Sequence, residues 1–143
     1  MFSKLRERGQ GESGFTLIEL LVVMLIIGLL AAIAIPAFFN QKDKATDSQA
    51  KVSARTAETS METFSTDNGG VYTGANVAAL VNIEPTLSGA TLAVTPTAPK
   101  TYHVDVTSGT GTVFTITRNA GGTTSLTCLP VNTGGCPSNN QWN

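Results

Sequence analysis

The feature that most limits what this chain can fold into is an apolar run near its N-terminus. From Leu20 to Phe39 there is no charged side chain, and a helix over this run is about 30 Å long. That length matches the hydrocarbon thickness of a bilayer. A surface helix of a small domain needs a polar face, which this run lacks. The run therefore predicts a membrane-spanning helix, and the basic residues ahead of it predict a cytoplasmic N-terminus.

Three interpretations of this run are open. The small residues at 32–34 (Ala-Ile-Ala) fit a secretory signal peptide that is cleaved behind the run. The second interpretation is a plain anchor that is never cut, and the third is a leader cut ahead of the run, between Gly14 and Phe15. Glu19 favours the third, because a carboxylate near the start of a membrane helix is unfavourable without a partner. Cleavage after Gly14 would create that partner, the α-amino group of Phe15 on an adjoining copy.

The segment GFTLIEL at residues 14–20 resembles the cleavage and methylation motif of type IV pilins and the related pseudopilins. The resemblance is close over roughly residues 1–67 and covers the rest only in general plan. It implies that a membrane prepilin peptidase cuts after Gly14 and that the new N-terminus, Phe15, becomes N-methylated. It also implies that Glu19 sets the register of subunits during assembly, and that Gly28 and Pro36 weaken and kink the helix.

Beyond the run, the same helix is predicted to continue to about Asp67, for a total length of about 80 Å. Apolar residues recur at spacings of four and three, which places them on one helix face: Ala50, Ala54, Ala57, Met61 and Phe64. Asn68-Gly69-Gly70 provides a helix stop. The pairs Asp47–Lys51 and Arg55–Glu58 are expected on solvated faces.

The C-terminal part is predicted to be rich in β-structure. Residues 71–100 are expected to form an irregular connection with a short helix over 77–81. Alternating apolar residues around Tyr102–Val106 and Phe114–Ile116 predict antiparallel strands, with turns at 108–111 and 119–122. The expected fold class is α+β, in which a long N-terminal helix, apolar in its membrane half and amphipathic in its second half, packs against a small antiparallel β-sheet.

The expected segments follow from this pattern. They are a prepilin leader over 1–14, a transmembrane or filament-core helix over 15–39, the amphipathic half of the same helix over 40–67, and a β-rich head with a disulfide loop over 68–143. If the head is exported, Cys128 and Cys136 are expected to form that disulfide, because exported compartments are oxidising. The alternative is two free thiols in a cytosolic protein. No metal or other cofactor is expected, since His103 is the single histidine.

The resemblance implies a structural subunit of a type IV pilus. Its expected partners are further copies of itself in a homo-oligomeric filament, the prepilin peptidase, the inner-membrane assembly platform, and membrane lipid before assembly. The expected localisation is a single-pass membrane protein with a cytoplasmic leader, which becomes part of a cell-surface pilus. The motif leaves open whether the filament serves adhesion, motility or DNA uptake.

Other functions are weighed against this one. An enzyme is not expected, because Glu84 and Asp105 lie in different elements and His103 has no evident reactive partner. A minor pilin for DNA uptake would need a basic track, and the head carries only Lys100 and Arg118, so no nucleic acid is expected. A pseudopilin of a type II secretion system shares the motif. Many pseudopilins hold calcium in the C-terminal loop, which needs oxygen ligands, and the tail after residue 122 has no acidic side chain.

Overall fold

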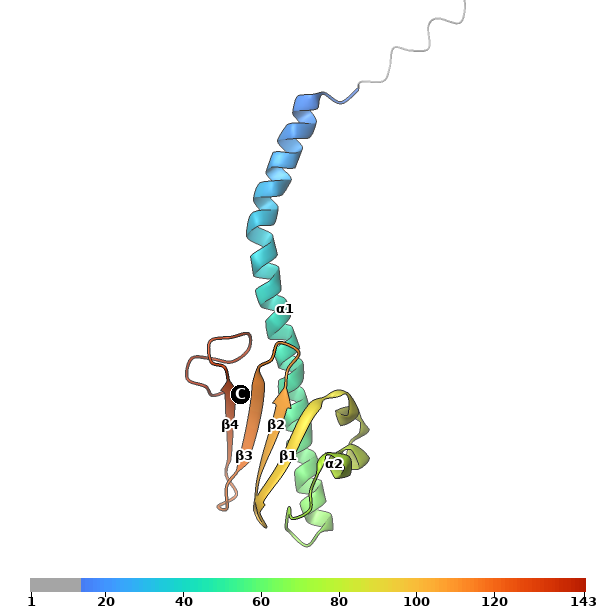
Figure 1. The fold of residues 1–143 in the computed structure, drawn as a ribbon, viewed down its shortest axis with the longest axis vertical. Coiled ribbons are helices and arrows are strands. Elements are labelled where there is room, and N and C mark those ends of the chain that lie inside the picture. The colour runs from blue at the N-terminus through green and yellow to red at the C-terminus, as the bar shows by residue number, and fades with distance from the viewer. Residues whose placement is uncertain (1–13) are drawn as a thin grey trace, which may run out of the picture. The chain divides into compact units, whose positions relative to one another are not determined.

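The computed structural model describes residues 14–143, so the leader predicted over 1–14 lies outside the described residues except for Gly14. In chain order the elements are α1 (Leu17–Asp67), α2 (Val77–Ile83), the 3₁₀ helix η1 (Pro85–Gly89), β1 (Thr91–Ala98), β2 (Thr101–Thr107), β3 (Val113–Arg118) and β4 (Thr124–Leu129) (Figure 1). The predicted α+β class is confirmed. The chain divides into two compact units, one ending at Phe38 and the other spanning Phe39–Asn143.

The first unit contains the N-terminal part of α1, and its apolar side chains are exposed except for Ala31, which is partly buried. By length and composition, α1 is the one helix in the described residues that is long and apolar enough to cross a membrane. The helix is assigned without interruption through Pro36, although proline removes one backbone hydrogen bond. The kink at Gly28 and Pro36 stays a prediction.

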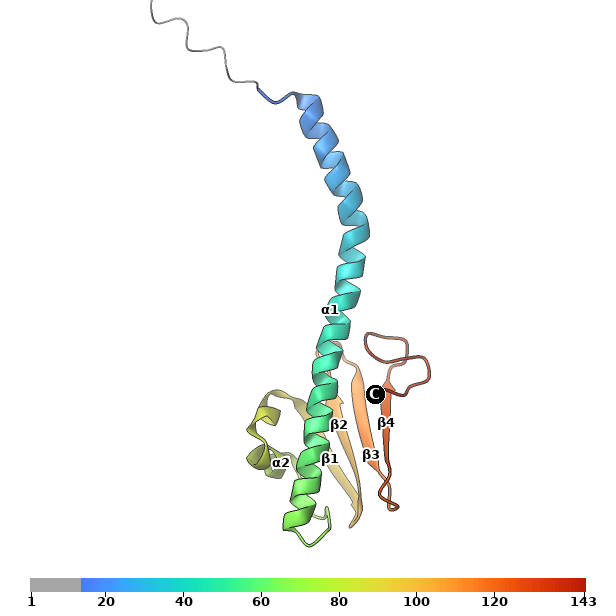
Figure 2. The same ribbon diagram turned by 180° about the vertical axis from the view of Figure 1, so that it is seen from behind.

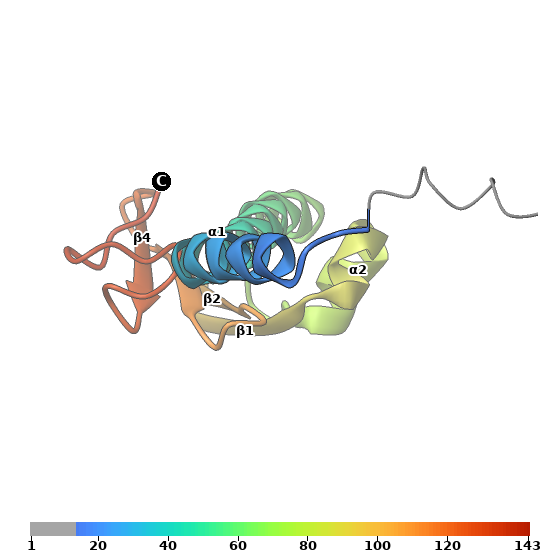
Figure 3. The ribbon, with the colours of Figure 1, turned by 90° about the horizontal axis from the view of Figure 1, so that it is seen from above.

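The second unit is a four-stranded antiparallel sheet with the C-terminal part of α1 across one face. Each strand pairs with the next in the chain, in the order β1-β2-β3-β4. Figures 1 and 2 show the helix and the sheet from opposite sides, and Figure 3 shows them from above. Alternate residues of the two central strands point into the core and are buried, which confirms both predicted strands: Tyr102, Val104, Val106, Phe114 and Ile116.

The helix face that meets the sheet is the predicted one. Ala54, Ala57 and Met61 are 0% exposed and Ala50 is 7% exposed. We call Ala50, Ala54 and Ala57 the alanine seam, because their short side chains allow the bulky side chains of the sheet to pack close to the helix axis. The helix ends at Asp67 as predicted.

Two glycines beyond Asp67 complete the helix stop. Gly69 and Gly70 have φ of 71° and 83°, in the left-handed region that favours glycine. The amide of Gly70 donates to the carbonyl of Ser65 at 2.8 Å, and so satisfies a carbonyl near the helix end.

The connection expected over 71–100 is more ordered than predicted. The short helix is confirmed as α2, and the side chain of its N-cap Asn76 accepts from the amide of Ala79 at 3.0 Å. The expectation that the rest is irregular is wrong, because Thr91–Ala98 forms β1 and pairs with β2. Pro96 lies within β1, and β1 is an edge strand, where the missing amide of a proline is tolerated.

Candidate functional site

The N-terminal end of α1 is closed by reciprocal hydrogen bonds between Thr16 and Glu19. The Glu19 carboxylate accepts from the Thr16 amide at 2.9 Å and from its hydroxyl at 2.7 Å. The Thr16 hydroxyl in turn accepts from the Glu19 amide at 3.3 Å. This is a capping box, in which a Thr-x-x-Glu sequence satisfies amides at the start of a helix. The charge of Glu19 was predicted to matter but this local role was not, although the Thr-x-x-Glu spacing is visible in the sequence.

The residues of the predicted processing site lie at the open end of the same helix. Gly14 and Phe15 precede the first helical residue, Leu17, and both are exposed. Phe15 is 83% exposed, so this peptide bond is accessible from outside the chain. Glu19 lies one turn into the helix on an exposed surface that is otherwise apolar.

The disulfide predicted between Cys128 and Cys136 is present, with a Cα–Cα distance of 5.7 Å. It closes a loop at the end of β4. The resemblance implies an exposed loop, and the residues at its tip are exposed. The two cysteines are not, at 1% and 3% exposed, and they belong to the hydrophobic core. The bond therefore lies in the core, while the tip of the loop that it closes is exposed.

Asp47 occupies a different place from the one expected. Its predicted position on a solvated face is wrong, because the residue is 0% exposed. One carboxylate oxygen accepts from the hydroxyls of Ser108 at 2.6 Å and Thr110 at 2.5 Å, and the other accepts from the amide of Gly135 at 2.6 Å. We call these four residues the Asp47 anchor. It joins α1, the β2–β3 turn and the disulfide loop.

The hydrogen bonds at the Asp47 anchor set the protonation state of the Asp47 carboxyl group. Burial alone would raise the pKa of Asp47, but bonds from Gly135, Ser108, Thr110 and Thr112 outweigh it and lower the pKa below the usual aspartate value. The carboxylate is therefore ionised at neutral pH. Nothing in the sequence near Asp47 pointed to this role, because its donors lie 61 or more residues away.

A second helix carboxylate, Glu62, gathers polar groups toward the other end of the same helix face. It accepts from the Arg118 guanidinium at 2.9 Å, from the Tyr72 hydroxyl at 2.9 Å and from the Tyr102 hydroxyl at 3.3 Å. Arg118 also lies over the Tyr72 ring, and the two tyrosine rings meet edge to face at 4.7 Å. We call these four residues the Glu62 cluster. The role of the Glu62 cluster is therefore structural, because its polar groups are paired with one another.

The two tyrosines of the Glu62 cluster are held in their neutral form. Burial first, and then the nearby charge of Glu62, raises the pKa of Tyr102 far above its ordinary value. Burial and the bond to Glu62 also raise the pKa of Tyr72.

The remaining polar residues considered in the sequence analysis are engaged in local contacts. His103 shares a hydrogen bond of 2.8 Å with Thr117, and Asp105 accepts from Thr115 at 2.6 Å. The expected pair Arg55–Glu58 is present at 3.1 Å. Among residues 14–143, no three His, Cys, Asp or Glu side chains cluster closely enough to hold a metal ion.

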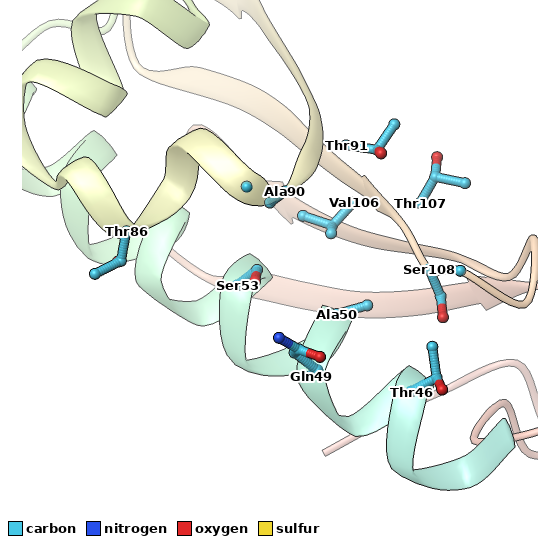
Figure 4. A pocket seen from close by; sticks show the side chains of 12 residues that line it. Thr46, Gln49, Ala50, Ser53, Thr86, Ala90, Thr91, Val106, Thr107 and Ser108 are labelled. Carbon is cyan, nitrogen blue, oxygen red and sulfur yellow. The ribbon is translucent and has the colours of Figure 1, made fainter. Parts of the chain in front are cut away.

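The head also has an open pocket of about 390 Å³ between α1 and the start of β1. Figure 4 shows Thr46, Gln49 and Ser53 of the helix on one side of it, and Val106 and Ser108 on the other. The residues that line the pocket are uncharged. Their hydroxyl and amide groups can form hydrogen bonds.

Comparison with known proteins agrees with these features. Residues 10–35 match the family model described as the prokaryotic N-terminal methylation motif. The chain is 47% identical over 51 residues to the type IV major pilin protein PilA of Myxococcus xanthus, a match covering 36% of this chain and 23% of that protein. It is 42% identical over 62 residues to the type II secretion system core protein G of Klebsiella michiganensis, covering 43% of each. These two matches therefore span less than half of this chain and less than half of each relative. No solved structure gives a significant match.

A third relative extends the similarity into the head. The chain is 33% identical over 107 residues to the type IV wide pilus major component PilA4 of Thermus thermophilus. That match covers 73% of this chain and 80% of the relative. With a methylation motif, an apolar helix and a sheet-bearing head in one chain, this protein belongs to the type IV pilin and pseudopilin superfamily.

Proposed function

We propose that this chain is a structural subunit of a type IV pilus that assembles through the apolar half of α1. The observation that carries the proposal is the continuous exposed apolar surface of that half, beside a head unit that has its own core. Such a surface needs either lipid or other copies of the same helix around it. Before assembly the proposed environment is the membrane, and afterwards it is the core of a homo-oligomeric filament on the cell surface.

Within this proposal the segments keep the bounds expected from the sequence. Residues 1–14 are the leader, 15–39 the transmembrane or filament-core helix, 40–67 the amphipathic half, and 68–143 the head. Gly28 and Pro36 supply flexibility within the core helix. The prepilin peptidase and an inner-membrane assembly platform are the proposed partners during processing and assembly.

Processing gives the first prediction. We expect the native protein to begin at Phe15 and to carry one N-methyl group, because the exposed Gly14–Phe15 bond precedes a Thr-Leu-Ile-Glu sequence. Intact-mass measurement of the protein from its native host tests this. A bulky or charged residue in place of Gly14 should leave unprocessed protein in the membrane, whereas Gly14→Ala should be partly tolerated. A chain that begins at Ile35 would instead support the signal-peptide interpretation.

A pseudopilin of a type II secretion system is the second candidate. The match to core protein G over the N-terminal part of the chain favours it. A minor DNA-uptake pilin has less support, because Arg118 of the head is bound by Glu62.

One experiment separates these functions. Surface filaments are sheared from native cells and their main subunit is identified by mass spectrometry. For a pilus subunit, this chain is the main component and its deletion removes the filaments. Loss of protein secretion on deletion, with surface filaments unchanged, would instead assign it to a secretion system.

A further inference from the structure

The disulfide of the head lies in the hydrophobic core, at the base of the loop that it closes. Both cysteines are buried, while Asn132 and Thr133 at the tip of the loop are exposed. A reductant reaches the sulfur atoms only after the chain around them opens, because thiol and phosphine attack needs access along the S–S bond. The contacts that hold the chain beside the two cysteines therefore control how fast the bond is reduced.

One such contact is the hydrogen bond between Asp47 and Gly135, and Val131 of the same loop also packs against the core. Gly135 immediately precedes Cys136, and its amide donates to Asp47 at 2.6 Å. Other hydrogen bonds of residues 130–136 stay within the loop: the Thr133 hydroxyl donates to the Pro130 carbonyl, and the Cys136 amide donates to the Thr133 carbonyl. A Cβ atom on Gly135 would lie 3.0 Å from the Asp47 Cβ, so the loop backbone rests directly against this side chain.

We propose that Asp47 protects the disulfide of the head from reduction. Its buried carboxylate holds Gly135 against α1 and so keeps reductants away from the Cys128–Cys136 bond. Loss of this carboxylate frees the Gly135 amide and the two hydroxyls of the β2–β3 turn together. The loop then opens locally without global unfolding, and the sulfur atoms become accessible.

The surroundings of Asp47 fix the direction of the pH effect. The charged groups within one turn on α1 are Asp43, Lys44 and Lys51, and the two loops packed on Asp47 carry no charged side chain. Since the folded-state pKa of Asp47 is lowered, its contribution is complete above the unfolded pKa of about 3.9 and is lost as pH falls through the folded value. The contact between Asp47 and Gly135 is therefore kept at neutral pH and weakens only in acid.

The test compares rates of disulfide reduction in the full-length chain, held in detergent at neutral pH. A water-soluble phosphine attacks one sulfur atom and the S–S bond breaks. Water then supplies the oxygen, and the products are phosphine oxide and two thiols. We expect Asp47→Asn to be reduced about tenfold faster than the unaltered chain, a ratio that corresponds to about 1.4 kcal/mol. The matched control is Asp43→Asn, one turn earlier and exposed, which should leave the rate unchanged.

Two further measurements keep the outcome decisive. If Asp47→Asn fails to fold, as judged by circular dichroism, Ser108→Ala replaces it; this change removes one donor and should still raise the rate severalfold. For the unaltered chain, the rate relative to a small disulfide peptide should be constant at higher pH and rise as pH falls below about 3.9. A rate that is equal in the folded variants and the unaltered chain would overturn the proposal.

Discussion

At the scale of single residues, the head is fastened by two acidic side chains of α1. Asp47 and Glu62 each accept hydrogen bonds from at least two other segments of the chain. They differ in exposure, because Asp47 is fully buried whereas the Glu62 side chain is 41% exposed. Removing a carboxylate leaves its buried donors without acceptors, and that penalty exceeds the net value of the bonds themselves.

We expect Glu62→Ala to destabilise the head by about 1–3 kcal/mol, because the fully buried Tyr102 hydroxyl loses its acceptor. Thermal unfolding of the full chain in detergent measures the change. The control is Glu58→Ala one turn earlier, which removes a partly exposed pair with Arg55 and should change stability by less than about 1 kcal/mol. Equal losses in the two variants would contradict a special role for the Glu62 cluster.

The tyrosines give a prediction at alkaline pH. The chain has two tyrosines, Tyr72 and Tyr102, and both have a raised pKa in the folded state. The unfolded chain therefore releases their protons first, so the folded state loses stability as pH rises above about 10. In an absorbance titration of the phenolate band, Tyr102 should ionise only together with unfolding. A reversible titration of both tyrosines near pH 10, with the near-ultraviolet circular dichroism unchanged, would be inconsistent with this environment.

At the scale of elements, the packing of α1 on the sheet depends on the alanine seam. Ala54 and Ala57 have no exposed surface, and large side chains of β2 and β3 complete the core around them. Interiors are packed as densely as organic crystals, so a larger side chain in the seam forces the sheet away from the helix.

We expect Ala54→Leu to destabilise the head by about 1–3 kcal/mol through overpacking. The control is Val52→Leu on the same helix, where the side chain is 64% exposed and the added volume meets solvent. Thermal unfolding distinguishes the two variants. Equal stability of Ala54→Leu and the unaltered chain would mean that the seam has free volume.

Much of the element plan was predictable from the sequence, because it rests on local periodicity. The apolar stripe of α1, the stop after Asp67 and the strands around Val104 and Ile116 are all local patterns, and all are confirmed. β1 was missed although Leu92, Val94 and Pro96 alternate with more exposed residues, and the edge position makes that proline acceptable. The burial of Asp47 was missed because it depends on loops far along the chain.

At the scale of the whole molecule, Glu19 has two possible roles that a single substitution does not separate. Its carboxylate completes the capping box with Thr16, and its charge is the proposed partner of the Phe15 amine in an adjoining subunit. Glutamine also completes a capping box but carries no charge. Glu19→Gln therefore isolates the charge, and Glu19→Val removes both functions.

We predict that Glu19→Val and Glu19→Gln are both made, inserted and cleaved, yet neither assembles alone into filaments. Removing the charge should not weaken insertion, because a carboxylate is unfavourable in lipid. The assay compares surface-filament and membrane fractions by immunoblot and electron microscopy, with partial incorporation expected on co-expression with the unaltered chain. Normal filaments from Glu19→Gln, with none from Glu19→Val, would assign the role of Glu19 to helix capping instead of register.

The positions of the two acidic side chains also have a mechanical consequence. Asp47 and Glu62 are 15 positions apart on α1, about 22 Å along the axis, with the alanine seam between them. A pull along the helix axis tends to slide α1 across the sheet, and this loads both groups of hydrogen bonds in shear at the same time. Bonds loaded in parallel share the force, so the head resists sliding better than it resists peeling from one end.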